Sequence, residues 1–322
     1  MATLLQSINQ FIDNISVTDR QEENIKNSVA NLDSNLMNKD NGLYVDRTFT
    51  NGSYERDTII RPLNDVDIFA VLKRDDWKDD YGNLPNPQSV LTKIKNYLNG
   101  LNDYKDKVFQ SRPCVTIELS DKDFDVLPSF AEAFGGYSIP NSDLKTWTYS
   151  YPEQLTTDLN NTHRSCNYKL KQVIKAIKYW NRENSKIIPS YHIEETAINI
   201  FKINTFQNFE EAIRLWFNNA EYNLVSQKFK SQDDYTSILN KIKKVKAKLN
   251  DAKKLYDENK EIEAIKIWKE IFVKEFPTVD VAEAKRFSES LSSGNLKVNS
   301  AGILSTTVGQ SVSASKGFYG DL

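Results

Sequence analysis

Two adjoining stretches carry the strongest signal in this chain: Asn51-Gly52-Ser53-Tyr54-Glu55-Arg56-Asp57-Thr58 and then Asn64-Asp65-Val66-Asp67-Ile68-Phe69-Ala70-Val71-Leu72. They set a Gly-Ser turn before a short apolar strand that opens with Asp65 and Asp67. Side chains at i and i+2 of a strand point to the same face, so these two carboxylates can chelate a hard divalent cation such as Mg²⁺. The turn offers backbone N–H groups and a hydroxyl to an anion. Together the two features predict the metal and phosphate sites that nucleotidyl transfer requires.

A third carboxylate, Asp125, stands inside another apolar strand, Phe124-Asp125-Val126-Leu127-Pro128. Burying a carboxylate beside apolar side chains is costly unless a positive charge neutralises it, and a metal ion would do so. Glu118 is the competing third acid, but it lies on a strand with polar alternation and is expected at the surface. We therefore expect Asp125 to join Asp65 and Asp67.

Three carboxylates make a two-metal site plausible, with two Mg²⁺ or Mn²⁺ ions roughly 3.5–4 Å apart. One ion would help to ionise an attacking hydroxyl, with Asp125 beside it, and the other would hold the triphosphate as pyrophosphate leaves. Ser53 and the backbone of Gly52 would hold the terminal phosphates.

The remaining pattern predicts an α+β fold, in which a small mixed sheet is followed by a helical lobe. Helical periodicity starts at residues 4–12, and Thr18 looks like the cap of a second helix. Strands are expected at 44–49, 67–72, 113–119 and 124–128, with a helix at 90–101. From about residue 167 the chain reads as helices, at 170–180, 193–206, 209–217, 234–250 and 252–276.

These elements suggest a core with N-terminal helices at 1–165, a helical lobe at 166–290 and a tail at 291–322. The tail holds seven serines and five of the eleven glycines, a composition typical of flexible segments.

Composition excludes several classes of protein. A net charge of −2 over 322 residues argues against direct binding of nucleic acid, since duplexes need dense Lys and Arg. The two cysteines, Cys114 and Cys166, are too far apart for a zinc ribbon. No 18-residue apolar stretch predicts a membrane span, and the N-terminus lacks a basic region before an apolar one. We therefore expect a cytoplasmic protein.

These motifs together resemble the signature of one known protein family. The Gly52–Thr58 and Asp65–Asp67 stretches and the Asp125 strand resemble the signature of bacterial CD-NTases, the cyclic-oligonucleotide synthases of CBASS anti-phage defence. This family is related to animal cyclic GMP–AMP synthase and oligoadenylate synthase. The similarity continues over roughly residues 1–280, through Lys178-Tyr179-Trp180-Asn181, Pro189-Ser190-Tyr191-His192-Ile193-Glu194 and the segment around Trp268.

The resemblance implies a polymerase-beta-like nucleotidyltransferase core, with the active site in a cleft facing the helical lobe. It implies that Asp65, Asp67 and Asp125 are the catalytic metal ligands. Gly52, Ser53, Lys178 and Ser190 would contact the triphosphate, and Tyr191 would stack on a base, as aromatic rings can without reading its edge.

The residues outside the three aspartates also have interpretations that do not involve nucleotide binding. Lys178 could extend from a packed helix toward solvent, and Tyr191 could be ordinary core with its hydroxyl bonded. Arg56 and Arg61 could contact phosphate or pair at the surface with Asp57 or Glu55.

The function expected is that of a cyclic oligonucleotide synthase, most simply a cyclic dinucleotide synthase, which makes a second messenger from ATP, GTP or other NTPs. One rival is a template-independent linear oligonucleotide, tRNA or protein nucleotidyltransferase. Another is a catalytically idle nucleotide-binding protein. The two distant cysteines cannot form the zinc insertion of the animal relatives, and the chain lacks the terminal glycine through which some family members are conjugated. The tail is a possible contact for a regulatory protein partner.

Overall fold

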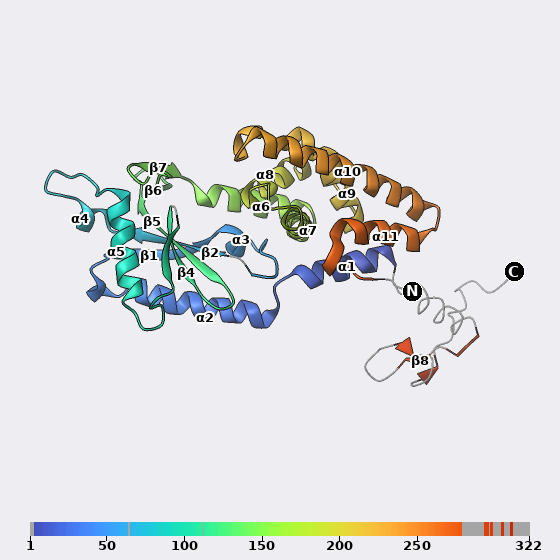
Figure 1. Cartoon of the computed structure of the whole chain (residues 1–322), viewed down its shortest axis with the longest axis horizontal. Coiled ribbons are helices and arrows are strands. Elements are labelled where there is room, and N and C mark those ends of the chain that lie inside the picture. The colour runs from blue at the N-terminus through green and yellow to red at the C-terminus, as the bar shows by residue number, and fades with distance from the viewer. Residues whose placement is uncertain are drawn as a thin grey trace. The chain divides into compact units, whose positions relative to one another are not determined.

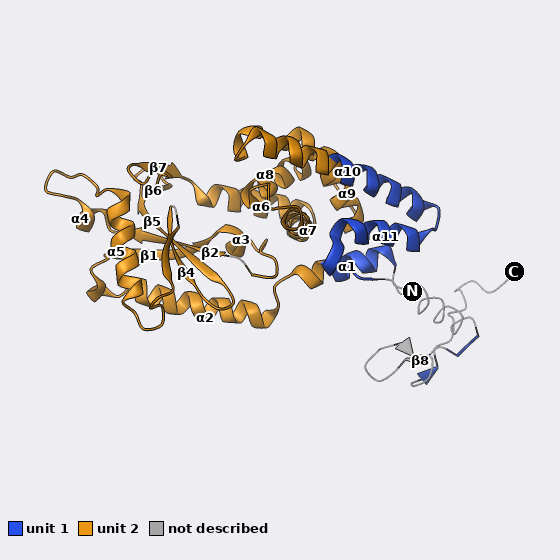
Figure 2. Cartoon of the chain, in the orientation of Figure 1, with its two compact units in different colours: residues 1–11, 243–322 blue, residues 12–242 orange. Residues whose placement is uncertain are grey.

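The computed structural model describes residues 3–63, 65–111, 113–278, 293–295, 297–298, 304–305 and 310–311. Contacts divide the chain into two units, one of residues 12–242 and one of residues 1–11 with 243–322 (Figure 2). All residues predicted to take part in catalysis belong to the first of these, which we call the large unit.

The large unit contains a seven-stranded mixed sheet (Figure 1). Its central path runs β1 (Val45–Asn51), β2 (Asp65–Leu72), β5 (Asp123–Ala131), β4 (Cys114–Glu118) and β3 (Val108–Ser111). β6 (Tyr137–Pro140) pairs with β5, and β7 (Trp147–Ser150) pairs with β6. Strands β2 and β5 are parallel, and the other pairs of this sheet are antiparallel. The strands predicted at 113–119 and 124–128 correspond to β4 and β5, which pair as a hairpin, whereas β3, β6 and β7 were not predicted.

Strand alternation gives the sheet two different faces. Val66, Ile68 and Ala70 of β2 point into a core shared with α2 (Asp19–Leu36) and α5 (Pro87–Asn99). Residues of the opposite parity, beginning with Asp65 and Asp67, lie on the other face. One face of the sheet is thus covered by helices, and the acids lie on the other.

The first helices begin close to the residues expected from the sequence. α1 spans Leu4–Ile15, and Thr18 caps α2 in a full capping box with Gln21. α5 begins at Pro87 after an Asn86 cap, three residues before the predicted start. The short helices are α3 (Gly52–Glu55) and α4 (Arg74–Trp77), and three 3₁₀ turns lie at Lys39–Asn41, Ser226–Lys228 and Val273–Glu275.

After the sheet the large unit is helical, with α6 (Pro152–Ser165), α7 (Leu170–Glu183), α8 (Ser190–Phe201) and α9 (Phe209–Asn223). Trp180, Trp216 and Phe217 pack in its interior. The predicted helices at 170–180, 193–206 and 209–217 correspond to α7, α8 and α9. α6 was not predicted, because its buried residues are only Leu159 and Thr162, too few to make an apolar stripe.

The long helix α10 corrects one prediction. It runs unbroken over Gln232–Asp257, so the break expected near residue 251 is wrong. Buried Val245, Leu249 and Ala252 continue the helical spacing across that point. The chain turns later, where Asn259 takes a left-handed backbone conformation (φ +59°) that asparagine tolerates.

The smaller unit holds α11 (Glu261–Phe272), with an aromatic cluster of Phe11, Trp268, Phe272 and Phe276. It also includes three two-residue strands in the order β10 (Gln310–Ser311), β8 (Lys297–Val298), β9 (Leu304–Ser305). Most of the predicted tail, 291–322, lies outside the described residues. Among the helices that are described, none is both long and apolar enough to span a bilayer.

Candidate active site

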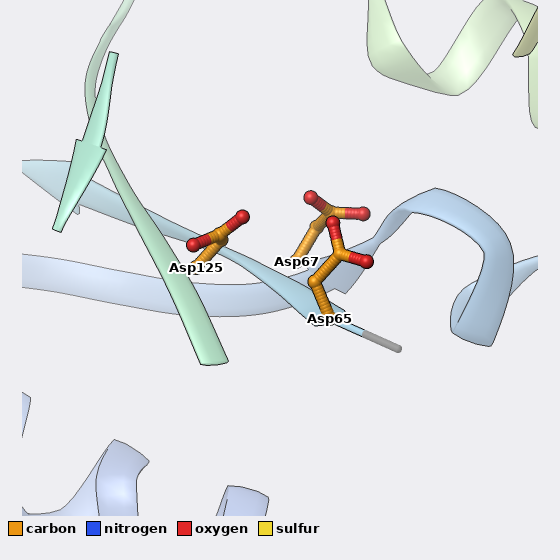
Figure 3. Close-up of side chains that lie close together, drawn as sticks. All are labelled: Asp65, Asp67 and Asp125. Atoms are coloured by element: carbon orange, nitrogen blue, oxygen red, sulfur yellow. The ribbon is translucent and has the colours of Figure 1, made fainter. Parts of the chain in front are cut away.

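Asp65, Asp67 and Asp125 come together on the open face of the sheet. The parallel register places Asp67 of β2 directly opposite Asp125 of β5. One carboxylate oxygen from each residue lies within 4.8 Å of the others. Figure 3 shows the three carboxyl groups pointing to the same side of their two strands. This convergence agrees with the expectation from the sequence that Asp125 joins Asp65 and Asp67.

The cluster is electrostatically costly in the absence of a cation. Burial, with the nearby charges of Asp65 and Asp125, raises the pKa of Asp67 to about 7. Burial also raises the pKa of Asp125, against the effect of a 2.5 Å hydrogen bond from Thr116 Oγ1. Closely spaced oxygen ligands that repel one another suit a hard divalent cation. The donor set therefore fits Mg²⁺ or Mn²⁺.

Asp123, one residue before the strand expected at 124–128, is a fourth acid on this face. It opens β5 opposite Asp65, and burial together with the charge of Asp65 raises its pKa. Its position two residues before Asp125 was the available signal, because i and i+2 share a face of a strand.

The Gly-Ser turn touches the carboxylates directly. Gly52 has a left-handed φ of +70°, and a Cβ built there would lie 1.7 Å from Asp67 Oδ2. Asn51 is the register partner of Asp67. The turn is held by Ser53, whose carbonyl accepts hydrogen bonds from the backbone N–H groups of Thr58 (2.8 Å) and Ile59 (3.0 Å). The turn and the metal ligands therefore form one structural unit.

Three residues predicted to contact phosphate line one small cavity of about 30 Å³: Ser53, Lys178 and Ser190. We call it the Ser53 cavity. Two cations that the sequence analysis missed, Arg182 and Lys186, also line it. For Arg182 the available signal was its position four residues after Lys178 on α7, about one helical turn. Lys186 lies beyond the end of α7 at Glu183, so helical spacing gave no signal for it.

Lys178 does not extend toward solvent. Its ammonium is buried and donates to Glu194 Oε1 (2.7 Å) and to Thr58 Oγ1 (2.8 Å). The structure thereby excludes the interpretation of Lys178 as a side chain reaching out from a packed helix.

Arg56 and Arg61 do not form the surface ion pairs that were one alternative for them. Arg56 is buried, donating from Nε to Glu194 Oε2 (2.7 Å) and from Nη1 to Asn51 Oδ1 (3.2 Å). Arg61 donates to backbone carbonyls, one of them that of Asp13 at 3.1 Å. Pairing of either arginine with Asp57 or Glu55 is therefore wrong for this structure, in which Asp57 pairs with Lys175 (2.8 Å).

Tyr191 follows Ser190 but is not one of the residues that line the Ser53 cavity. Its side chain is 44% exposed, so it is not ordinary core. Lys228 Nζ lies 5.3 Å from the centre of its ring. Glu118 is exposed, as predicted.

A larger cavity of about 600 Å³ lies along the edge strand β1 and includes Asn51. Three carboxylates line it, from Asp33, Glu55 and Glu153, together with Phe49 and Thr156. Its acidic lining suits hydroxyl and amino groups that donate hydrogen bonds and disfavours phosphate.

Sequence comparison finds one matching family, described as the Second Messenger Oligonucleotide or Dinucleotide Synthetase domain, over residues 1–162. A cyclic AMP-AMP-AMP synthase of Acinetobacter sp. is 32% identical over 145 residues, which cover 42% of this chain and 40% of that protein. A probable cyclic nucleotide synthase of Bacillus cereus is 26% identical over 270 residues, covering 70% of this chain and 81% of the relative. The aligned part is thus less than half the length of the Acinetobacter protein.

Solved structures show the same fold. The E. coli CdnC structure with ATP matches with a TM-score of 0.68 at 16% identity, covering 85% of this chain and 99% of CdnC. The Vibrio cholerae DncV cyclic AMP-GMP synthase, in complex with a linear intermediate, matches with a TM-score of 0.67 at 12% identity. That match covers 86% of this chain and 97% of DncV. The fold is accordingly an α+β nucleotidyltransferase fold with a polymerase-beta-like core.

Proposed function

Since this chain belongs to the family of second messenger oligonucleotide or dinucleotide synthetases, we propose that it joins nucleoside triphosphates into a cyclic oligonucleotide, most simply a cyclic dinucleotide. Family membership confirms the resemblance to bacterial CD-NTases. The observation that carries the activity is the convergence of Asp65, Asp67 and Asp125 beside the Gly52–Ser53 turn.

In each transfer, a ribose hydroxyl of one nucleotide attacks the α-phosphorus of another. The new O–P bond forms as the bond to the β-phosphate breaks, and pyrophosphate leaves with the electron pair. Two bound Mg²⁺ or Mn²⁺ ions would supply charge neutralisation and a more acidic hydroxyl. Asp65, Asp67 and Asp125 would hold these ions, and Asp125, beside the ion nearest the attacking hydroxyl, would accept the hydroxyl proton.

The remaining predicted residues would bind the nucleotides. The Gly52 backbone, Ser53, Lys178 and Ser190 would contact the triphosphate, which the cations around the Ser53 cavity support. Tyr191, whose ring is exposed, would stack on a base. In this scheme residues 1–165 form the catalytic core, and the lobe that begins at residue 166 holds the nucleotides.

The larger cavity beside Asn51 has the size and chemistry for the second nucleoside. Its carboxylates can accept hydrogen bonds from ribose hydroxyls or exocyclic amines. Closing the ring requires a second transfer, so the linear intermediate must turn over and present its other end. Two unlike pockets near one set of metal ligands support that sequence of events.

We propose that the product is a second messenger of cytoplasmic antiviral signalling, as the CBASS resemblance implies. One solved relative, E. coli CdnC, forms a complex with a HORMA protein. By analogy, a regulatory protein is the partner we propose for this chain, with its C-terminal tail as a contact.

The function is tested by incubating the protein with all four NTPs and Mg²⁺ or Mn²⁺. A cyclic product resists phosphatase, requires divalent metal, and is absent when Asp65 and Asp67 are both replaced by Ala. The matched control replaces Asp75 and Asp76, two acids of α4 outside the site, and should leave the yield unchanged. Products that keep a terminal phosphate would identify a linear transferase instead. Nucleotide binding without any product would identify an idle binding protein.

A further inference from the structure

Glu194 of α8 is the most thoroughly bonded buried carboxylate near the proposed site. Its side chain is 0% exposed and accepts hydrogen bonds from Arg56 Nε (2.7 Å), Thr58 Oγ1 (2.5 Å) and Lys178 Nζ (2.7 Å). Arg56 and Thr58 immediately follow α3, and Lys178 lies on α7. One carboxylate therefore joins three separate segments of the large unit.

The hydrogen bonds of this network join two buried cations, Arg56 and Lys178, to the single carboxylate of Glu194. Asp67 is the other acid whose charge acts on both cations, and the proposed function assigns it to the metal ions, so one positive charge is left for a ligand. A buried excess charge is costly unless a ligand neutralises it. Lys178 also lines the Ser53 cavity, together with Ser190. An anion in this cavity would supply the missing negative charge.

The geometry also leaves Lys178 a donor for that anion. An ammonium group has three N–H donors, and Glu194 and Thr58 accept two of them. The two hydrogen bonds fix the orientation of the ammonium group, so the direction of its third N–H is also fixed before a ligand binds. A donor fixed before the ligand arrives binds with a smaller loss of conformational entropy.

We propose that Glu194 is a positioning residue for the triphosphate, which holds Lys178 charged and aimed into the Ser53 cavity and ties the Gly52–Ser53 turn to α7 and α8. This rests on the proposed function, in which Lys178 and Ser53 contact the triphosphate. The tie to the turn runs through Thr58, whose N–H donates to the Ser53 carbonyl. Arg56 extends it to Asn51, beside Asp67.

The protonation of Lys178 is where a positioning role differs from a purely structural one. Burial lowers the pKa of Lys178, Glu194 raises it, Arg56 lowers it and Asp67 raises it. Two further cations, Arg182 and Lys186, line the same cavity. Removing the Glu194 charge should therefore let Lys178 lose its proton at a lower pH. Removing the Arg56 charge should have the opposite effect.

The test measures binding of inorganic tripolyphosphate with Mg²⁺ to the full chain, by calorimetry across a pH series. Tripolyphosphate needs no base recognition and no catalysis, so the result does not depend on which nucleotides are joined. Ratios of variant to wild-type Kd cancel the ionisation of the probe. For Glu194→Gln, a near-isosteric change, we expect the ratio of variant to wild-type Kd to rise with pH, reaching about tenfold or more at the alkaline end of the series.

Two further variants make the test decisive. Glu210→Gln removes another buried acid, paired with Arg214 in α9 at 2.8 Å, and should leave the Kd ratio flat with pH. Arg56→Gln should move the alkaline loss of binding to higher pH, and it provides the test if Glu194→Gln does not fold. Parallel pH profiles for wild type and either network variant would overturn the proposal, as would failure of wild type to bind tripolyphosphate. A protein that binds tripolyphosphate with the expected profiles but makes no product would overturn the proposed function alone.

Discussion

Gly52 lies so near the Asp67 carboxylate that no side chain fits at this position. Gly52 sits where any Cβ would overlap Asp67 Oδ2, at 1.7 Å. Its backbone is also left-handed (φ +70°), which costs a non-glycine residue roughly 1–2 kcal/mol. Backbone conformation and steric room therefore both require glycine here, whereas most positive-φ glycines face only the first requirement.

Gly52→Ala should consequently reduce product formation by about 100-fold or more, because Asp67 must move out of the metal cluster. Product yield with NTPs and Mg²⁺ measures this. The matched control is Gly82→Ala, at φ +80° with nothing within 4 Å of the added Cβ. It carries the same backbone cost and should keep full activity. Equal losses in the two variants would show that backbone strain alone explains the requirement.

Among the elements, the parallel pair of β2 and β5 is the one that builds the site. It is a parallel pairing in an otherwise antiparallel set of strands, and it aligns Asp65 with Asp123 and Asp67 with Asp125. A shift of one residue would turn one strand's acids toward the helical core. The alternating apolar residues Val66, Ile68, Phe124 and Val126 prevent that shift, because they are buried against α2 and α5. Packing on one face therefore fixes the chemistry on the other.

Helix α2 supports that face, and its first turn offers a simple test of helix capping. Thr18 Oγ1 accepts from the Gln21 N–H (3.3 Å), and Gln21 Oε1 accepts from the Thr18 N–H (3.1 Å). Thr18→Ala should lower the free energy of unfolding by about 1 kcal/mol with no loss of activity. Urea denaturation measures the change. Thr236→Ala, inside α10, is the control and should be neutral or slightly stabilising. An unchanged stability in Thr18→Ala would contradict the role of the cap.

The stability of the whole protein should depend on pH through the carboxylate cluster. The pKa of Asp67 is raised to about 7, so the folded state holds a proton that the unfolded chain releases. A raised carboxyl pKa stabilises the fold at low pH, and that stability is lost as the pH rises from about 4 to about 7. A rise of the pKa from 3.8 to about 7 corresponds to at most about 4 kcal/mol.

In EDTA, the wild-type free energy of unfolding should therefore fall by about 2–4 kcal/mol between about pH 4.5 and about pH 8. In Asp67→Asn the free energy of unfolding should change much less with pH. In Asp75→Asn, which removes an exposed acid, it should fall as in the wild type. Mg²⁺ should restore stability to wild type at about pH 8, because it binds the ionised cluster. Parallel curves for wild type and Asp67→Asn would show that Asp67 does not hold the proton.

Local patterns were sufficient for much of this molecule. The i and i+2 spacing places Asp65 and Asp67 on one face of any strand, and the apolar neighbours of Asp125 mark it as a buried acid in need of a partner. Thr18 and Gln21 predict a helix start from four residues. These inferences hold because the periodicity of a strand or helix is a property of the backbone and does not depend on what packs against it.

Other features depend on contacts between distant segments. Arg56 and Glu194, 138 positions apart, form a buried pair that no spacing could indicate, and sequence reasoning assigned Arg56 only local partners or phosphate. The pairing of Asp67 with Asp125 required a parallel register, and α6 lacked an apolar stripe because it buries so little. Burial is set by the segments that cover a residue, and so the partner of a charge emerges only when the chain is folded.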